Sequence, residues 1–286
     1  MRFLFYNVGR QDRIGLVKAM IDEHDVDIVM LAECVTPPSI LLEQFNPTTD
    51  RPYLLHSDVS PIKRARRANI RVLARLPANS LRAIPQDNPS LVAIHLRPPV
   101  GLDIVLIVAH LPSKLHRDDL DQFVGSIRVI KGVERAESAT GIDRTVMVGD
   151  FNMNPFEGGV AGGEGLHAVM SRTEALERSR VVDGAKRRFF FNPMWSRLGD
   201  DSRGPPGTYY HRSGQQLCYF WNTFDQVIIR PELLPFFLDA KLQVVTEIGT
   251  VSLLNSLGRP DPSIGSDHLP LMFELEIDKG GLDYGY

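Results

Sequence analysis

Eight polar residues lie at or just after the ends of apolar segments of this sequence. They are Asn7, Glu33, His110, Asp150, Asn152, Asp225, Asp267 and His268. Ligands and catalytic groups of α/β proteins gather where strands end, so we expect one shared site. Taken singly, each residue has an ordinary structural explanation, because an asparagine or aspartate can cap a turn and a histidine can be a hydrogen-bonded part of the core. The prediction therefore depends on the set.

The residue types in this set suit acid–base chemistry at a hard divalent cation. Carboxylate oxygens are the ligands such a cation prefers, Mg²⁺ takes only one or two of them, and Glu33 is the first candidate. The Asn152 amide can donate to a phosphoryl oxygen without adding negative charge, and Asp150 can hold a water molecule or a proton. His268 can act as a base if a second carboxylate, for which Asp225 is the candidate, holds its other ring nitrogen.

Short apolar segments rich in branched residues predict the strands that position these side chains. The expected strands cover residues 2–6, 26–31, 69–73, 91–96, 102–110, 208–210, 224–229, 241–245 and 269–277, with another ending at Asp150. Helical spacing predicts helices over 14–21 and 117–137, and two prolines can open a short helix over 37–45. Residues 155–207 are rich in glycine and proline and are expected to form loops.

Composition indicates an ordinary globular protein. The 286 residues are 43% hydrophobic and 23% charged, and no linker separates two regions of different composition, so we expect one domain over residues 1–286.

No apolar run approaches the length of a membrane span, and the amino terminus does not resemble a secretory signal, which favours a cytoplasmic protein. Cys34 and Cys218 are far apart and predict free thiols, with no tetrahedral zinc site.

The overall charge argues against a protein that coats nucleic acid, because the formal net charge is −3 and the pI is near 6.2. Local clusters of basic residues are still present, and such clusters are more often solvated surface than binding sites. One cluster comprises Lys63, Arg64, Arg66, Arg67, Arg71 and Arg75, and another comprises Arg178, Arg180, Lys186, Arg187 and Arg188. Basic residues interleaved with rings can bind a single strand, which makes Lys186, Arg187, Arg188, Tyr209 and Tyr210 candidate substrate-binding residues.

Six short motifs carry a resemblance to a known family. They are NVG at Asn7, LAE ending at Glu33, AHLPSK at His110, GDFNMNP at Asp150, FDQVII at Asp225 and SDHLPL at His268. In this order they resemble the endonuclease/exonuclease/phosphatase superfamily, also called deoxyribonuclease I-like. The resemblance implies an α/β fold, a four-layer α/β/β/α sandwich with two packed mixed β-sheets and the site at one end.

The resemblance also implies roles for individual residues. Glu33 looks like the main metal ligand, with Asn7 and Asp267 near the metal. His268, oriented by Asp225, looks like the general base or a phosphate-activating group.

The remaining matched residues look like groups that act on the phosphate. Asp150 resembles the residue that orients the water or protonates the leaving oxygen, and Asn152 resembles a phosphate binder. His110 stands where abasic-site enzymes of the family carry a tyrosine motif, which argues against that DNA-repair branch. Gly9 replaces a polar residue two positions after Asn7, so we expect a single metal ion.

Three functions remain open from the sequence. The first is a Mg²⁺-dependent nuclease on DNA or RNA, with Mn²⁺ as a substitute metal and nucleic acid as partner. The alternative is a phosphatase or phosphodiesterase acting on a lipid headgroup or a small nucleotide, and no membrane partner is expected. The third is a binding module without catalysis, which is disfavoured because every matched position is filled.

Overall fold

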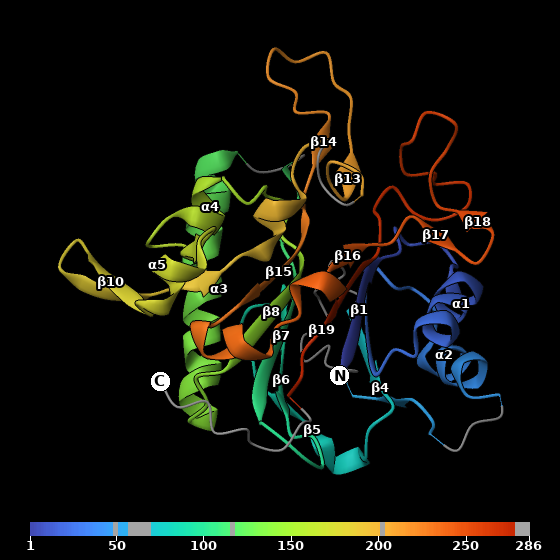
Figure 1. The fold of residues 1–286 in the computed structure, drawn as a ribbon, viewed down its shortest axis with the longest axis horizontal. Coiled ribbons are helices and arrows are strands. Elements are labelled where there is room, and N and C mark those ends of the chain that lie inside the picture. The colour runs from blue at the N-terminus through green and yellow to red at the C-terminus, as the bar shows by residue number, and fades with distance from the viewer. Residues whose placement is uncertain (48–50, 57–69, 115–117, 201–203, 278–286) are drawn as a thin grey trace.

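The fold consists of two mixed β-sheets packed face to face, with helices on both outer sides (Figure 1). The computed structural model describes residues 1–47, 51–56, 70–114, 118–200 and 204–277. The two packed sheets with helices on their outer sides confirm the predicted four-layer α/β/β/α arrangement. Four of the basic residues considered above, from Lys63 to Arg67, lie outside the described residues.

The first sheet has the strand order β16-β19-β1-β2-β4-β3. Its strands are β1 (Arg2–Asn7), β2 (Ile28–Ala32), β3 (Leu54–Leu55), β4 (Arg71–Ala74), β16 (Gln243–Val244) and β19 (Leu271–Glu274). β1 runs parallel to β2 with Asn7 opposite Ala32, so the residues that follow these two strands emerge at the same sheet edge.

The second sheet has the order β5-β6-β7-β8-β15-β12-β9. Its strands are β5 (Leu81–Ile84), β6 (Leu91–Leu96), β7 (Ile104–His110), β8 (Thr145–Asp150), β9 (Ala168–Val169), β12 (Phe190–Phe191) and β15 (Asp225–Ile229). β7 runs parallel to β8, with His110 opposite Asp150. β15 is antiparallel to β8, so its first residue, Asp225, also lies opposite Asp150.

Helices cover the outer face of each sheet. α1 (Ile14–His24) and α2 (Pro38–Phe45) lie beside the first sheet, and α3 (Asp119–Thr140) lies along the second (Figure 1). The shorter helices are α4 (Gly158–Ala161), α5 (Arg172–Leu176), η1 (Ala78–Ser80), η3 (Pro193–Arg197), η4 (Pro231–Phe236) and η5 (Asp239–Lys241). Three small hairpins complete the fold: β10 (Ser179–Val182) with β11 (Ala185–Arg188), β13 (Tyr209–Tyr210) with β14 (Trp221–Asn222), and β17 (Glu247–Ile248) with β18 (Val251–Ser252).

The core follows from the alternation of side chains along the strands. On β7, Leu106 and Val108 belong to the core between the sheets, whereas Ile107 and Ala109 belong to the core beneath α3. A strand that is buried on both faces reads as a continuous apolar run, as the sequence of β7 does. Only its last residue, His110, reaches the sheet edge as a polar group.

The segment 155–207 contains more regular structure than the sequence indicated. β9 and β12 extend the second sheet at its edge, and β10 and β11 form a projecting hairpin. Strands of two to four residues are too short for a hydrophobic period to be detected, so the expectation of loops was wrong for these parts.

Gly149 supplies a test of how tightly β8 packs. A Cβ atom at this position would lie 1.9 Å from the carbonyl oxygen of Ala109 on the neighbouring strand. Gly149→Ala should therefore lower the free energy of unfolding by more than about 2 kcal/mol, as expected of backbone overpacking. Chemical denaturation of the purified variant measures this.

The matched control is Gly125→Ala on α3, where nothing beyond the helix's own backbone and the two chain neighbours lies within 4 Å of the added methyl group. This variant should be as stable as the parent chain or more so, by about 1 kcal/mol, because alanine has the higher helix propensity. Equal stability of the two variants would contradict the packing argument.

Candidate active site

Residues from both sheets meet at the upper end of the molecule in Figure 1. Asn7 ends β1 of the first sheet, and its Nδ2 donates to Oδ2 of Asp150, which ends β8 of the second sheet, at 3.0 Å. The Asn7 Oδ1 accepts from the backbone N–H of Gly9 at 3.1 Å. The predicted residues Asn7 and Asp150, far apart in sequence, are thus in direct contact.

His268 and Asp225 form a buried hydrogen-bonded pair. The Nδ1 of His268 lies 2.8 Å from Oδ2 of Asp225, and the Nε2 lies 3.8 Å from Oδ2 of Asp150. Burial by itself disfavours the charged imidazolium, but the carboxylates of Asp225 and Asp150 outweigh it and raise the pKa of His268 to about 10. The imidazole therefore holds its proton at neutral pH, with Nε2 turned toward Asp150.

The loop that follows β8 is fixed by its own hydrogen bonds. The backbone N–H of Asn152 donates to Oδ1 of Asp150 at 2.9 Å, and Asn152 adopts a left-handed φ of 51°. The side-chain Nδ2 of Asn152 donates to the carbonyl of Leu111 at 2.9 Å. An amide nitrogen has two protons, so the second N–H of Asn152 is available to a ligand.

Glu33 lies on the more open side of the site. It follows β2 with a left-handed φ of 52°, and its side chain is 23% exposed. Its Oε2 pairs with Nε of Arg10 at 3.1 Å, and its Oε1 lies 3.5 Å from Nε2 of His110. The same nitrogen of His110 is 3.8 Å from Asp150, so His110 lies between these two carboxylates.

Asp267 is exposed next to the amino-terminal motif. A Cβ added to Gly9 would come within 3.5 Å of Oδ1 of Asp267 and 3.0 Å of the hydroxyl of Ser266. The glycine therefore lets the Asp267 loop approach the end of β1. The candidate metal residues Asn7 and Asp267 accordingly flank the same turn.

One group of side chains in the described part of the chain has the spacing of a metal site. Its members are Asp150, Asp225 and His268, whose potential ligand atoms lie within 4.8 Å of one another. Hydrogen bonds already engage Asp225 with His268 and both oxygens of Asp150. Glu33, Asn7 and Asp267 present carboxylate and amide oxygens, which are the donors that Mg²⁺ prefers, and Asp267 Oδ1 accepts from the hydroxyl of Ser266 at 3.1 Å.

Aromatic side chains extend toward solvent from the cluster of Asn7, Asp150, Asp225 and His268, which is the candidate catalytic cluster. The ring of Tyr209 lies 4.7 Å from the ring of His268, 5.3 Å from that of Phe224 and 6.4 Å from that of the exposed His211. The predicted substrate-binding residue Tyr209 is therefore beside the site.

Tyr210 faces a different neighbour from Tyr209. The guanidinium of Arg259 lies 4.2 Å from the centre of the Tyr210 ring, and Trp221 meets the ring edge-on at 5.5 Å. This half-buried ring joins the β13–β14 hairpin to the loop that follows β18. The structure thus places Tyr210 against Arg259 and Trp221, and not against His268.

The structure does not bring the other predicted substrate-binding residues to the cluster. Arg187 pairs with Glu164 at 2.6 Å, and Arg188 pairs with Glu137 and Asp143, both at 3.1 Å. Glu137 also accepts from the hydroxyl of Thr145, which begins β8, so Arg188 lies at the end of β8 opposite to Asp150. Lys186 is an exposed residue of the same hairpin.

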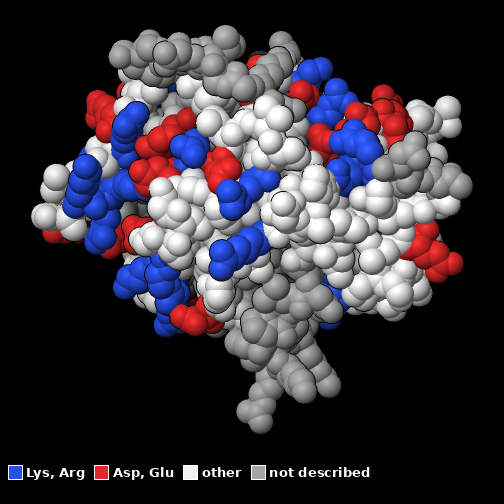
Figure 2. Space-filling view, turned by 90° about the horizontal axis from the view of Figure 1, so that it is seen from below, with Lys and Arg blue, Asp and Glu red and all other residues white. Residues whose placement is uncertain are grey.

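Acidic and basic side chains are mixed on the molecule away from the site. Figure 2 views the end opposite the catalytic cluster and shows Lys and Arg next to Asp and Glu over much of that face. Interleaved charges of both signs do not form a continuous track for a phosphate backbone.

A supporting network that the sequence did not reveal holds the loops around Asn152. The side chain of Asn154 donates to Glu157 at 3.0 Å and to Asn222 at 2.9 Å, and its Oδ1 accepts from the backbone N–H of Thr223. Lys114 pairs with Glu157. The motifs AHLPSK and GDFNMNP contain Lys114 and Asn154, but only the structure shows that they meet.

Comparison with known proteins agrees with this geometry. The model of the endonuclease/exonuclease/phosphatase family matches residues 4–268. The chain belongs to this family. No sequence among the curated proteins matches it.

Three solved structures of endonuclease/exonuclease/phosphatase type illustrate the shared fold. An AP endonuclease from Archaeoglobus fulgidus is 13% identical with a TM-score of 0.55, covering 97% of this chain and 100% of its own. A mannosyl-6-phosphatase from Bacteroides thetaiotaomicron is 12% identical with a TM-score of 0.57, covering 96% and 99%. TDP2 from D. rerio, complexed with a single-strand DNA product, is 14% identical with a TM-score of 0.54, covering 96% and 97%.

These neighbours share the fold and differ in the substrates that their names give. At such identities the likeness shows the fold alone. Within the described part of this endonuclease/exonuclease/phosphatase family member, no helix has the length and apolar character to cross a membrane.

The pKa of His268 predicts how stability depends on pH. The folded state keeps a proton that an unfolded histidine releases near pH 6.5, so this contribution is complete below pH 6.5 and is lost as pH rises toward 10. The slope for one proton is at most about 1.4 kcal/mol per pH unit. Denaturant unfolding across this range should show the decline in the parent chain and a smaller decline in His268→Gln. Identical slopes for the parent chain and His268→Gln would show that His268 does not hold this proton.

Proposed function

We propose that this protein is a Mg²⁺-dependent phosphodiester hydrolase that acts on a polynucleotide, DNA or RNA. The observation that supports this best is the His268–Asp225 pair, whose second imidazole nitrogen, Nε2, lies 3.8 Å from Asp150. The surrounding cluster combines an acid, a cationic donor and the amides of Asn7 and Asn152. Such a set can bind a phosphoryl group and move a proton beside it.

Glu33, Asn7 and Asp267 are the residues proposed to hold the cation. Glu33 Oε2 pairs with the guanidinium of Arg10 at 3.1 Å, and a bound metal cation would replace this exposed arginine as the partner of the carboxylate. The Asn7 Oδ1 accepts one hydrogen bond and has a second lone pair. A divalent cation bound there would supply Lewis-acid stabilisation of charge on a phosphoryl oxygen.

His268 is proposed to act as a charged donor to the phosphate. Its raised pKa favours this role over that of a general base, because an imidazolium donates from Nε2 while Asp225 holds Nδ1. Asn152 adds a neutral N–H donor, which stabilises developing charge on the phosphate.

Asp150 is proposed to handle the proton. Its Oδ2 lies within 3.8 Å of both His268 and His110, and hydrogen bonds from Asn7 and Asn152 fix the carboxylate. A carboxylate held in this way can orient a water molecule for attack or transfer a proton to the leaving oxygen. His110 is proposed to keep Glu33 and Asp150 in place from between them.

The stacked rings support a substrate with bases. Tyr209 is half-buried beside His268, and its neighbour His211 is exposed, so a base next to the bound phosphate can pack against the exposed part of the Tyr209 ring. The neighbouring structure of TDP2 from D. rerio is complexed with a single-strand DNA product, which supports the proposal of a polynucleotide substrate. The cations Lys186, Arg187 and Arg188 do not contribute to this proposal, because two of them are paired with acids.

The dependence of the rate on metal distinguishes the proposed ligand, Glu33, from the proposed acid–base residue, Asp150. EDTA should abolish hydrolysis, and Mg²⁺ or Mn²⁺ should restore it. Glu33→Gln should raise the Mg²⁺ concentration needed for half-maximal rate, because one anionic ligand is lost. Asp150→Asn should instead lower kcat by about a hundredfold or more at saturating Mg²⁺, the scale of losing one acid–base group. Steady-state kinetics in a Mg²⁺ titration measure both effects.

Rates that persist in excess chelator would exclude the metal-dependent mechanism. A normal Mg²⁺ dependence in Glu33→Gln would exclude Glu33 as the main ligand and leave the rest of the mechanism in place.

Tyr209→Leu tests the substrate class. Loss of one stacked base should raise KM for a short single-stranded oligonucleotide about five- to hundredfold, the scale of base–aromatic stacking. The same substrate with an abasic sugar next to the scissile phosphate should show no such rise, because no base is present to stack. KM measurements on both substrates give the comparison.

Tyr219→Leu is the matched control, because Tyr219 is exposed and packs on Phe156 at 5.3 Å instead of on the catalytic cluster. An equal effect of Tyr209→Leu on both substrates would contradict base stacking. Faster hydrolysis of a phosphomonoester than of any oligonucleotide would contradict the polynucleotide substrate and indicate a small one. The assignment of the protein as a phosphoesterase would remain.

A further inference from the structure

The backbone of residues 150–154 is held from outside by neutral side-chain amides. Asn152, the proposed phosphate donor of this loop, has a left-handed φ of 51°. A residue other than glycine keeps such a conformation only where its surroundings fix it. One N–H of its side chain donates to the carbonyl of Leu111 at 2.9 Å. The direction of the second N–H therefore depends on where the backbone of Asn152 is held.

Gln122 of α3 supplies a donor to the carbonyl of Asn152. The Nε2 of Gln122 donates to this carbonyl at 2.8 Å and lies 3.5 Å from the carbonyl of Pro112. The Gln122 side chain is only 6% exposed, and its Oε1 accepts no hydrogen bond within the described part of the chain, so this residue serves as a donor. One buried amide thus contacts both the loop that follows His110 and the loop that follows Asp150.

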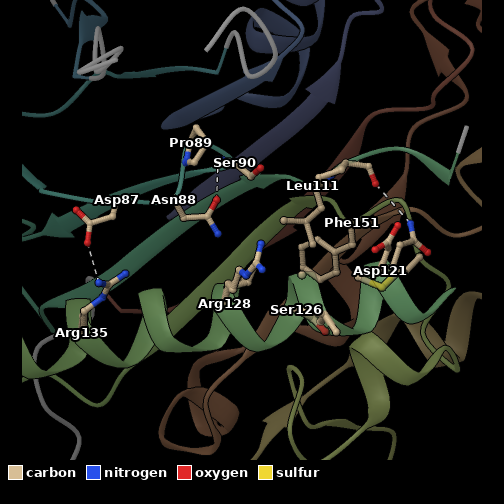
Figure 3. A pocket seen from close by; sticks show the side chains of 16 residues that line it. Asp87, Asn88, Pro89, Ser90, Leu111, Asp121, Ser126, Arg128, Arg135 and Phe151 are labelled. Atoms are coloured by element: carbon tan, nitrogen blue, oxygen red, sulfur yellow. Dashed lines mark hydrogen bonds and ion pairs between the residues drawn. The ribbon is translucent and has the colours of Figure 1, made fainter. Parts of the chain in front are cut away.

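The first turn of α3 is fixed, so Gln122 can act as a support. Asp118 caps the helix, and its Oδ1 accepts from the backbone N–H of Asp121 at 2.7 Å. Figure 3 shows the side chains of Leu111 and Phe151 extending from the strand ends toward this helix, and both are buried. A side chain on a packed helix holds its hydrogen-bond partner more precisely than one on a loop.

A second glutamine holds the next residue of the loop from the other side. The Nε2 of Gln226 on β15 donates to the carbonyl of Met153 at 2.6 Å and to that of Thr223 at 2.9 Å. Its Oε1 accepts from the side chain of Asn192 at 2.8 Å. Successive carbonyls of the loop are therefore bonded to amides from α3 and from β15. Gln122 is the one of these two glutamines that contacts the proposed phosphate donor itself.

We infer that Gln122 is a positioning residue that acts through Asn152. Without the amide donor, the buried carbonyl of Asn152 has to turn toward another partner, because an unpaired buried carbonyl is costly. That rotation of the backbone moves the free N–H of the Asn152 side chain away from the phosphate. The inference rests on the role proposed for Asn152, and it requires a phosphate ester but not a polynucleotide as substrate.

A double-mutant cycle on bis(p-nitrophenyl) phosphate with saturating Mg²⁺ tests this coupling. Gln122→Met nearly keeps the side-chain length and removes both N–H donors. It should lower kcat about ten- to hundredfold, the scale of misplacing a substrate-binding group by about 1 Å. In the Asn152→Ala background it should change kcat by less than about twofold, because the group that Gln122 positions is absent. A glutamine with a merely structural role would lower kcat by the same factor in both backgrounds.

Hydrogen exchange gives a second readout that needs no hydrolysis. Gln122→Met should speed exchange of the backbone amides of residues 151–153 and leave residues 133–140, at the far end of α3, as in the parent chain. Ser126→Ala is the matched control, because Ser126 is 1% exposed one turn further along α3 and its hydroxyl donates to the carbonyl of Phe123 in the same helix. It should change neither kcat nor exchange at residues 151–153.

Three results would overturn the inference: unchanged kcat in Gln122→Met, an equal loss in both backgrounds, or unchanged exchange at residues 151–153. Full activity of Asn152→Ala would overturn it as well, because Gln122 would then have no substrate-binding group to position. If the parent chain cleaves the small diester but no oligonucleotide, the polynucleotide proposal fails and the cycle still decides the role of Gln122. If it cleaves no phosphate ester, the proposed function fails, and the exchange experiment still decides whether Gln122 holds the loop.

Discussion

The hydrogen bond from Asn7 to Asp150 is the contact on which the arrangement of the site depends, because it joins the two sheets at their common edge. Asn7 ends a strand of the first sheet and Asp150 ends a strand of the second. The His268–Asp225 pair makes a second link of the same kind, since His268 precedes β19 and Asp225 begins β15. Catalytic geometry in this fold is therefore a consequence of how the two sheets pack, and small shifts of one sheet against the other would separate donors from acceptors.

Two buried carboxylates, those of Asp150 and Asp225, lie opposite each other at this sheet edge, and their mutual repulsion must be offset. Asp150 and Asp225 are register partners on β8 and β15, and like charges so close disfavour simultaneous ionisation. Burial raises the pKa of Asp225, and the imidazolium of His268 between the two acids offsets the repulsion. The neutral amides of Asn7 and Asn152 add donors without adding negative charge. Removing His268 alone would leave the acids uncompensated, so this histidine contributes to the electrostatic balance as well as to the proposed chemistry.

The sequence was most informative where a polar residue ends a long apolar strand. Strands over residues 2–6, 102–110 and 224–229 and one ending at Asp150 were expected, and the structure brings Asn7, His110, Asp150 and Asp225 together, although Asp225 begins its strand and does not end it. The period of the apolar residues along a strand indicates which of its faces are buried. It also indicates where the apolar run stops, and thus which polar residues lie at the sheet edge.

The hydrophobic pattern of the sequence could not predict the side-chain partners of surface residues. Arg187 and Arg188 had the appearance of free cations in sequence, yet acids 23 to 51 residues away along the chain pair with them. Tertiary ion pairs have no local signature, and the same limit applies to the network of Lys114, Asn154 and Glu157. The left-handed conformations of Glu33 and Asn152 were likewise invisible, because neither residue type requires a positive φ.

The site has a buried half and an exposed half, and this division has consequences for its evolution and its ligands. The side chains of Asp150 and His268 are at most 9% exposed, whereas Glu33 is 23% exposed and its partner Arg10 is 62% exposed. Substitutions in the buried half disturb the packing of both sheets, so variation is easier in the exposed loops that surround it. Neighbours that share the whole fold at 12% to 14% identity are named for different substrates, as this division leads one to expect. Ligand specificity in this chain should therefore depend on the β13–β14 hairpin and the open side around Glu33, while the proposed proton transfer should depend on the edge where the two sheets meet.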